Sequence, residues 1–418
     1  MHDEILLPAR VELSEVNGCA YASPGRTRAH NVASAVALYF AFALTGFGIA
    51  LLGSTLPTML AHWSLTDRRG GALFFAIFLG SSLGALLSRG VMVHSVPRGA
   101  ALLVAACCTL AFASGWAVFP VFFVYGLGLG ISITSINRLR SQRCVRSRIT
   151  EMNRLNLAWG LGAFSCPLLA NEFLRLADVR TLFIALATAF AVFTAWMLLA
   201  ERETVIAAEV QSEAARRSGA RLPAIVALTT LMATGLESSA GAWIATYADR
   251  LRNEFEAPVA TATVFWLGLL AARALYSTKL VGNFTEPVLL RFSTAVAAAG
   301  CVLLLAAQSQ AILLIAGFLI GFGVGPVYPL LLAAVLPRVS GNAIFVAAGL
   351  GGTVFPWLTG ALSTQAGSLR IGMFVPLAAG MALVACATGV AGALAAVNKG
   401  SHPASPLYAH GPADQGSG

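Results

Sequence analysis

The chain has 418 residues, of which 57% are hydrophobic and 11% are charged, and its formal net charge is +9. Soluble domains carry about 25% charged residues, so this composition excludes a soluble globular protein and indicates a chain whose solvent is lipid. The length suits about twelve membrane-spanning helices of about 20 residues each. Residues 1–30 are polar and contain no long apolar run, so we expect no cleaved signal peptide.

Apolar runs bounded by charges, proline or glycine predict twelve membrane-spanning helices. The first six cover residues 33–60, 71–93, 99–118, 121–136, 154–172 and 181–200, and the last six cover residues 222–247, 259–279, 288–307, 311–336, 343–364 and 371–397. The predicted fold is therefore an all-α polytopic membrane protein. We expect a cytoplasmic segment at 1–30, helix bundles at 31–200 and 222–397, a cytoplasmic linker at 201–221 and a disordered cytoplasmic tail at 398–418.

The basic residues predict the orientation of these helices. If the N-terminus is cytoplasmic, most of the 27 Lys and Arg residues fall on the cytoplasmic side, as the positive-inside rule requires. The densest basic run, residues 138–148, lies between the fourth and fifth predicted helices and is expected to contact anionic lipid headgroups. We therefore expect an inner-membrane protein with both termini in the cytoplasm and no nucleic-acid partner.

Two glycine patterns each occur twice, at equivalent places in the two halves of the chain. Gly-Leu-Gly followed by four residues and Pro covers residues 160–167 and 349–356, and Gly-x-Gly-x-Gly covers residues 126–130 and 321–325. Small residues let helix backbones approach closely in a membrane. The repetition predicts two parallel six-helix bundles related by a pseudo-two-fold axis along the membrane normal. The glycines by themselves are compatible both with static packing and with motion.

Glu237 is the one carboxylate deep inside a predicted helix. A buried charge in a membrane is costly unless it is paired, hydrated or protonated, and such residues commonly mark ion or substrate pathways. We predict that Glu237 binds substrate or couples transport to a proton or another cation. The alternative is a structural glutamate that is protonated or hydrogen-bonded.

Further candidates for substrate binding carry amides or aromatic rings. Asn153, Asn156 and Trp159 share one side of the fifth predicted helix, and amides beside an indole suit a hydroxyl-rich ligand. The alternative for these is hydrogen bonding between helices. Additional aromatic faces are predicted at Trp243, Trp266, Tyr328 and Trp357, for which the alternatives are packing, contact with lipid or an interfacial belt.

Arg89 and Arg273 end the second and eighth predicted helices at equivalent positions of the two halves. This placement predicts a gate or an anchor to the end of a neighbouring helix, whose C-terminal dipole favours a cation. The alternative is snorkelling of a long basic side chain to the membrane surface.

The sequence contains no HExxH, GxSxG, P-loop or paired carboxylates at fixed spacing. We therefore expect no catalytic residues, no cofactor and no metal site, and any uphill transport would draw on an ion gradient. The seven cysteines form no CxxC pair and are expected to pack as small apolar side chains.

Over residues 33–397 the chain resembles the major facilitator superfamily and, within it, the fucose–hexose permease-like branch. The residues that carry the resemblance to this branch lie at 235–237, 241–247, 152–156, 160–162 and 352–357. The resemblance implies a secondary-active or facilitative transporter of a sugar-like solute that works by alternating access. We expect the solute to be small and mostly neutral, because the predicted cavity is nearly free of buried charge, and we expect the protein to be a monomer. Its expected partners are the substrate, the lipid bilayer and a coupling proton or sodium ion.

The chain departs from the family pattern in two respects. Residues 84–89 resemble the start of the family's loop motif, but Ser88 replaces the usual Asp, which puts the usual gate in doubt. The predicted first and fourth helices lack the acids that the proton-coupled fucose permease uses, so Glu237 would carry the proton alone. Uniport, sodium coupling, efflux of amphipathic compounds and a receptor that no longer transports remain alternatives.

Overall fold

The structure is a computed structural model that describes residues 13–16, 19–22, 28–88, 92–143, 148–200, 221–252, 257–278, 284–335 and 343–400. These residues are helical almost throughout, apart from short connections and a two-stranded antiparallel hairpin formed by β1 (Leu13–Val16) and β2 (Cys19–Ala22). The expectation of a helical membrane protein is therefore confirmed, and the short hairpin precedes the first helix.

The described helices form two sets in chain order. The first set comprises α1 (Arg28–His62), α2 (Asp67–Leu87), α3 (Met92–Leu110), α4 (Val118–Arg143), α5 (Arg148–Leu176) and α6 (Val179–Ala200). The second set comprises α7 (Arg221–Arg252), α8 (Ala257–Tyr276), α9 (Glu286–Ala306), α10 (Gln310–Val324), α11 (Val327–Val335), α12 (Ala343–Ala366), α13 (Leu369–Gly372) and α14 (Phe374–Gly400). Nine helices in the described part of the chain are long and apolar enough to cross a membrane, so the protein is a multi-pass membrane protein.

Several boundaries differ from those predicted. The break between the third and fourth helices lies at a 3₁₀ turn, Gly115–Ala117, rather than at Pro120, because proline is tolerated in the first turn of a helix. The predicted tenth helix is split into α10 and α11 at Pro326, where the missing backbone donor interrupts the helix. Helix α14 continues to Gly400 and so includes the first residues of the predicted tail.

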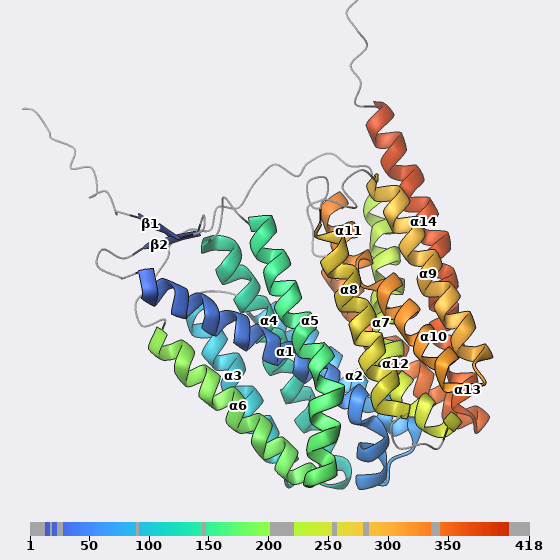
Figure 1. The fold of residues 1–418 in the computed structure, drawn as a ribbon, viewed down its shortest axis with the longest axis horizontal. Helices are drawn as coiled ribbons and strands as arrows, with labels where there is room; N and C mark the ends of the chain where they lie inside the picture. Colours follow the sequence, from blue (N-terminus) through green and yellow to red (C-terminus); the bar gives the residue numbers. More distant parts are fainter. Residues whose placement is uncertain are drawn as a thin grey trace, which may run out of the picture.

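Figure 1 shows the two sets of helices side by side, with α2 reaching towards the second set. The principal contacts within the first set are α2–α4, α1–α5 and α3–α4, and those within the second are α7–α12, α8–α10 and α9–α10. The two sets meet mainly through α2–α12, α5–α8 and α1–α7. We call the end that holds the start of α1 and the end of α14 the terminal face, and the opposite end, where α2 begins and α7 and α12 end, the distal face.

The repeated Gly-Leu-Gly pattern has the same packing role in both sets. A Cβ on Gly162 would lie 1.8 Å from the carbonyl oxygen of Ala43 in α1, and one on Gly351 would lie 2.4 Å from that of Leu231 in α7. The first glycine of each pattern instead faces the other set, Gly160 against α8 and Gly349 against α2. Close backbone approach therefore accounts for the second glycine of each copy, whereas the first glycine lies against a side chain of the other set.

Candidate functional site

Glu237 lies midway along α7 and faces α8. Gly241, one turn further on, shares its side of the helix, and a Cβ there would lie 3.2 Å from the ring of Phe265 and 3.4 Å from that of Trp266 in α8. The Glu237 side chain is 18% exposed, while its neighbours Leu236 and Ser239 are fully buried. The carboxylate is thus held inside the helix bundle, as the sequence predicted, rather than on its outer surface.

Arg273, in the last turn of α8, is the charged partner of Glu237. Its Nη2 atom lies 3.8 Å from Glu237 Oε1, and its side chain is only 12% exposed. Its Nε donates a hydrogen bond of 3.2 Å to the carbonyl oxygen of Gly325, the residue that ends α10. This geometry places a cation against a helix C-terminus and does not fit the snorkelling alternative.

Two tryptophans, one from each helix set, lie beside this ion pair. The guanidinium carbon of Arg273 lies 5.2 Å from the ring centroid of Trp159 in α5, within the range of a cation–π contact. Trp159 in turn packs edge-on against Trp266 of α8, with centroids 5.9 Å apart. The buried Nε1 of Trp266 has no hydrogen-bond partner among the residues that the structure describes.

Tyr328 lies in the first turn of α11. It directly follows the break between α10 and α11, whose Gly325 carbonyl binds Arg273. We call Trp159, Glu237, Trp266, Arg273 and Tyr328 the central cluster. It combines an anion, a cation and aromatic faces at the junction of the two sets. Because the ion pair is longer than a hydrogen bond, a hydroxyl group or a water molecule could bridge it.

The other predicted site residues lie elsewhere or outside the description. Asn156 is half-buried in α5, one turn before Trp159, whereas the side chain of Asn153 and the whole of Arg89 lie outside the described residues. Trp243 is fully buried and donates from Nε1 to the carbonyl oxygen of Pro356 at 2.9 Å. Trp357 packs against Phe75 of α2. These two tryptophans thus lie in the contact between α2, α7 and α12, which favours the packing alternative for them.

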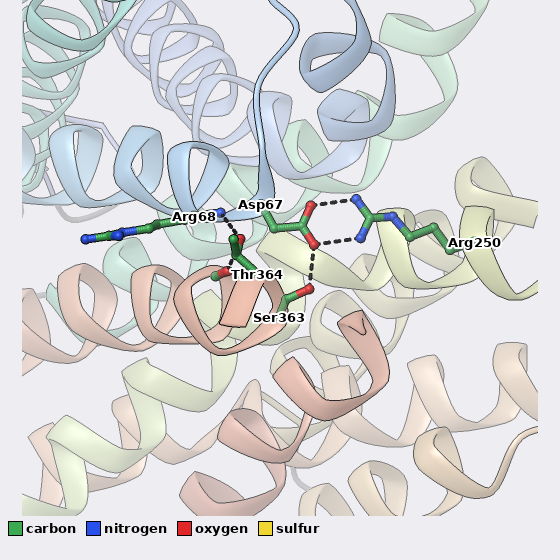
Figure 2. A network of polar contacts seen from close by, with 6 residues as sticks. Asp67, Arg68, Arg250, Ser363 and Thr364 are labelled. Carbon is green, nitrogen blue, oxygen red and sulfur yellow. Dashed lines mark hydrogen bonds and ion pairs between the residues drawn. The ribbon is translucent and has the colours of Figure 1, made fainter. Parts of the chain in front are cut away.

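A second polar network lies at the distal face, and sequence reasoning missed it. Figure 2 shows Asp67, at the start of α2, between Arg250 of α7 and Ser363 of α12. Arg250 donates to both carboxylate oxygens, at 2.5 and 2.6 Å, and the Ser363 hydroxyl donates to Oδ2 at 2.5 Å. Asp67 is 183 and 296 residues from these partners, so no local pattern in the sequence links them.

The start of α2 is capped by α12 in the same network. The first amides of a helix have no partner within it, and the N-cap residue Thr66 makes no side-chain cap. Instead the amide of Arg68 donates to Thr364 Oγ1 at 2.8 Å, as Figure 2 shows. We call Asp67, Arg68, Arg250, Ser363 and Thr364 the distal network.

A multi-pass helical protein with an ion pair and aromatic rings at the junction of two helix sets has the build of a membrane transporter. The family model "Major Facilitator Superfamily" matches residues 38–344, and the chain therefore belongs to this superfamily. It is a transporter and not an enzyme.

Two individual proteins are similar to the chain, one in sequence and one in structure. The chain is 23% identical over 359 residues to the glucose/mannose transporter GlcP of Bacillus subtilis (strain 168), a match that covers 78% of this chain and 87% of the relative. A crystal structure of a mutant of the nucleoside transporter NupG superposes with a TM-score of 0.67 at 12% identity and covers 87% of this chain and 99% of that one. The structural match shows the shared fold alone.

Proposed function

We propose that the protein moves a small, mostly neutral, sugar-like solute across the inner membrane by alternating access. Twelve membrane spans form two six-helix bundles related by a pseudo-two-fold axis along the membrane normal. The terminal face is cytoplasmic, in keeping with the excess of basic residues in the loops expected on that side.

The equivalent glycine contacts support the two-bundle arrangement. A Cβ on Gly126 of α4 would lie 2.0 Å from the carbonyl oxygen of Ile77 in α2, and one on Gly321 of α10 would lie 2.0 Å from that of Phe265 in α8. The helix pairs α2–α4 and α8–α10 therefore use matching positions of the two repeats. Together with the matched contacts of Gly162 and Gly351, these pairs support parallel repeats.

The single observation that carries the substrate class is the central cluster. Glu237 and Arg273 supply an acceptor and several donors, and Trp159 and Trp266 supply flat apolar faces. Alternating hydroxyls and C–H faces of a sugar match this combination. The two charges are opposite and adjacent, so the site has little net charge and disfavours strongly ionic solutes. The glucose/mannose transporter among the relatives is consistent with this class.

Glu237 also provides the means of coupling. When Glu237 is ionised, Arg273 neutralises its charge across 3.8 Å. When a proton or another cation neutralises Glu237, Arg273 loses this partner and keeps only its contacts with Trp159 and the Gly325 carbonyl. Arg273 therefore anchors the end of α10 in both states and is the counter-ion of Glu237 only when Glu237 is ionised. Movement of a cation through the site is thereby linked to the contact between α7 and α8.

A binding screen followed by a flux assay tests the proposal. We expect one or more neutral hexoses to raise the thermal unfolding temperature of the purified protein, because a ligand stabilises the folded state that binds it. The same sugar is expected to enter proteoliposomes. If a ligand bound and no solute moved in any screen, the proposed transport function would be excluded and the protein would be a receptor. A response to amphipathic drugs with none to sugars would favour the efflux alternative.

A further inference from the structure

We infer that Asp67, Arg250 and Ser363 form a latch that holds the two helix sets together at the distal face, and that this latch opens during each transport cycle. The inference rests on the proposed alternating access. It assigns Asp67 as a positioning residue, since Asp67 acts on the relative placement of helices and not on the solute.

Both oxygens of the Asp67 carboxylate accept hydrogen bonds, and their side-chain donors among the described residues lie in the other helix set. Arg250 of α7 binds both oxygens in a fork, and Ser363 of α12 adds a third hydrogen bond. Such bidentate, charge-assisted hydrogen bonds are among the strongest in proteins. The Asp67 side chain is 10% exposed, which protects these bonds from competition with water.

The backbones beneath the latch approach as closely as their side chains permit. A Cβ on Gly360 of α12 would lie 2.3 Å from the carbonyl oxygen of Asp67, and one on Gly71 of α2 would lie 3.0 Å from Trp357. On the next layer, a Cβ on Gly53 of α1 would lie 2.3 Å from the carbonyl oxygen of Gly241 in α7. The latch therefore closes over a seam in which the two sets are already in contact.

The same contact can be broken without stranding a charge in lipid. Arg250 is 43% exposed, so when the helices separate both charged groups can be hydrated at the distal face. A fully buried ion pair would carry a much larger penalty on separation. The hydrogen bonds of Asp67 thus favour the closed distal face, and the exposure of Arg250 allows the bonds to break.

Hydrogen exchange of the full chain in lipid nanodiscs tests the latch without any substrate, so its failure is distinguishable from failure of the proposed function. Asp67→Asn is expected to accelerate exchange about tenfold in three segments together, namely the start of α2, the end of α7 and the end of α12. Ser363→Ala keeps the ion pair and is expected to give a smaller acceleration in the same segments; it also serves if Asp67→Asn does not fold. The charge-swapped pair Asp67→Arg with Arg250→Asp is expected to restore protection.

The matched control is Glu172→Gln, which removes an equally short ion pair that lies within the single helix α5. It is expected to leave the three latch segments unchanged. Exchange that rises only in the turn containing Asp67, or as much for Glu172→Gln as for Asp67→Asn, would overturn the latch.

Opening during transport is tested by bridging the latch covalently. Asp67→Cys combined with Ser363→Cys is treated with a short, reducible bis-methanethiosulfonate, and each single variant controls for the native cysteines. We expect the bridge to lower solute flux at least about tenfold while ligand binding persists, and a reductant to restore the flux. Unchanged flux in the bridged protein would refute opening of the latch. If the unmodified protein moved no solute, the proposed function would fail and the exchange measurement would still decide whether the latch exists.

Discussion

The central cluster and the distal network both contain an acid–arginine pair between different helices, but the pair is widely spaced in the central cluster and closely hydrogen-bonded in the distal network. Glu237 and Arg273 are 3.8 Å apart, and aromatic rings surround them. Asp67 instead receives three hydrogen bonds of 2.5 to 2.6 Å. The Glu237–Arg273 pair leaves donors and acceptors that a solute can bind, whereas the donors and acceptors of the distal network bind one another and hold the helices together. Binding is thus assigned to the middle of α7 and positioning to its C-terminal end.

The largest effect is expected for Glu237→Gln, which tests whether the central pair couples transport to an ion. The substitution keeps the shape of the side chain but removes its charge and its ability to carry a proton. We expect gradient-driven accumulation in proteoliposomes to fall to the equilibrium level, while exchange of labelled for unlabelled solute continues. Accumulation at the level of the unmodified protein would remove Glu237 from coupling.

The next largest effect is expected for Arg273→Gln, which leaves Glu237 as a buried charge without its partner. Such a change typically costs about 3–5 kcal/mol, and here we expect a loss towards the lower end because Glu237 can become protonated. The double variant Glu237→Gln with Arg273→Gln is expected to regain most of this stability. Reversible unfolding in detergent measures both, and equal losses in the single and the double variant would show that the two charges are not coupled.

These two residues show how far the sequence could lead. A lone carboxylate in an apolar run was enough to select Glu237, and the end of a predicted helix was enough to select Arg273. Nothing in their spacing showed that they form a pair, since that depends on how α7 and α8 are rotated about their axes. Periodicity does not specify this rotation, because the side of a membrane helix that faces lipid can be as apolar as the side that faces its neighbours.

The distal network lay further beyond the reach of sequence reasoning. Asp67 stands in a short connection where a solvated acid is unremarkable, and its partners are distant in the chain. The one available hint was an acid on the side of the membrane expected to hold few basic residues, where Arg250 was also placed. The helix boundaries at Pro120 and Pro326 differ for a local reason, because the effect of proline depends on whether it lies in the first turn or the interior of a helix.

A smaller effect is expected for Asp67→Asn, which tests how much the distal network contributes to the stability of the folded protein. We expect a loss of about 1–2 kcal/mol in the free energy of unfolding, less than for a fully buried pair because Arg250 is 43% exposed. Unfolding in detergent measures the loss. The central cluster is untouched, so affinity for the solute at the binding site is expected to change far less than stability. An equal loss of affinity would show that the two regions are not separable.

A still smaller effect, on affinity alone, is expected for Trp159→Ala. The substitution removes an aromatic face and the ring beneath the Arg273 guanidinium, which together contribute about 1 kcal/mol. Solute affinity is therefore expected to fall roughly fivefold in a calorimetric titration. Trp159→Phe keeps a ring and is expected to retain most of the affinity. A phenylalanine variant as weak as the alanine variant would point to the indole nitrogen rather than the aromatic face.

The smallest effect is expected for Glu172→Gln, and it isolates what makes the distal network different. Arg175 donates to both oxygens of Glu172, at 2.5 and 2.8 Å, so the fork geometry resembles that of Arg250 on Asp67. Both side chains are 54% exposed and lie three residues apart in α5, where water and salt weaken their attraction. We expect no measurable change in unfolding stability, solute flux or hydrogen exchange outside this turn. A loss of stability equal to that of Asp67→Asn would mean that the bidentate geometry alone sets the contribution of an ion pair to stability. No loss for Glu172→Gln would assign the effect of Asp67 to its burial and to the separate helices that it joins.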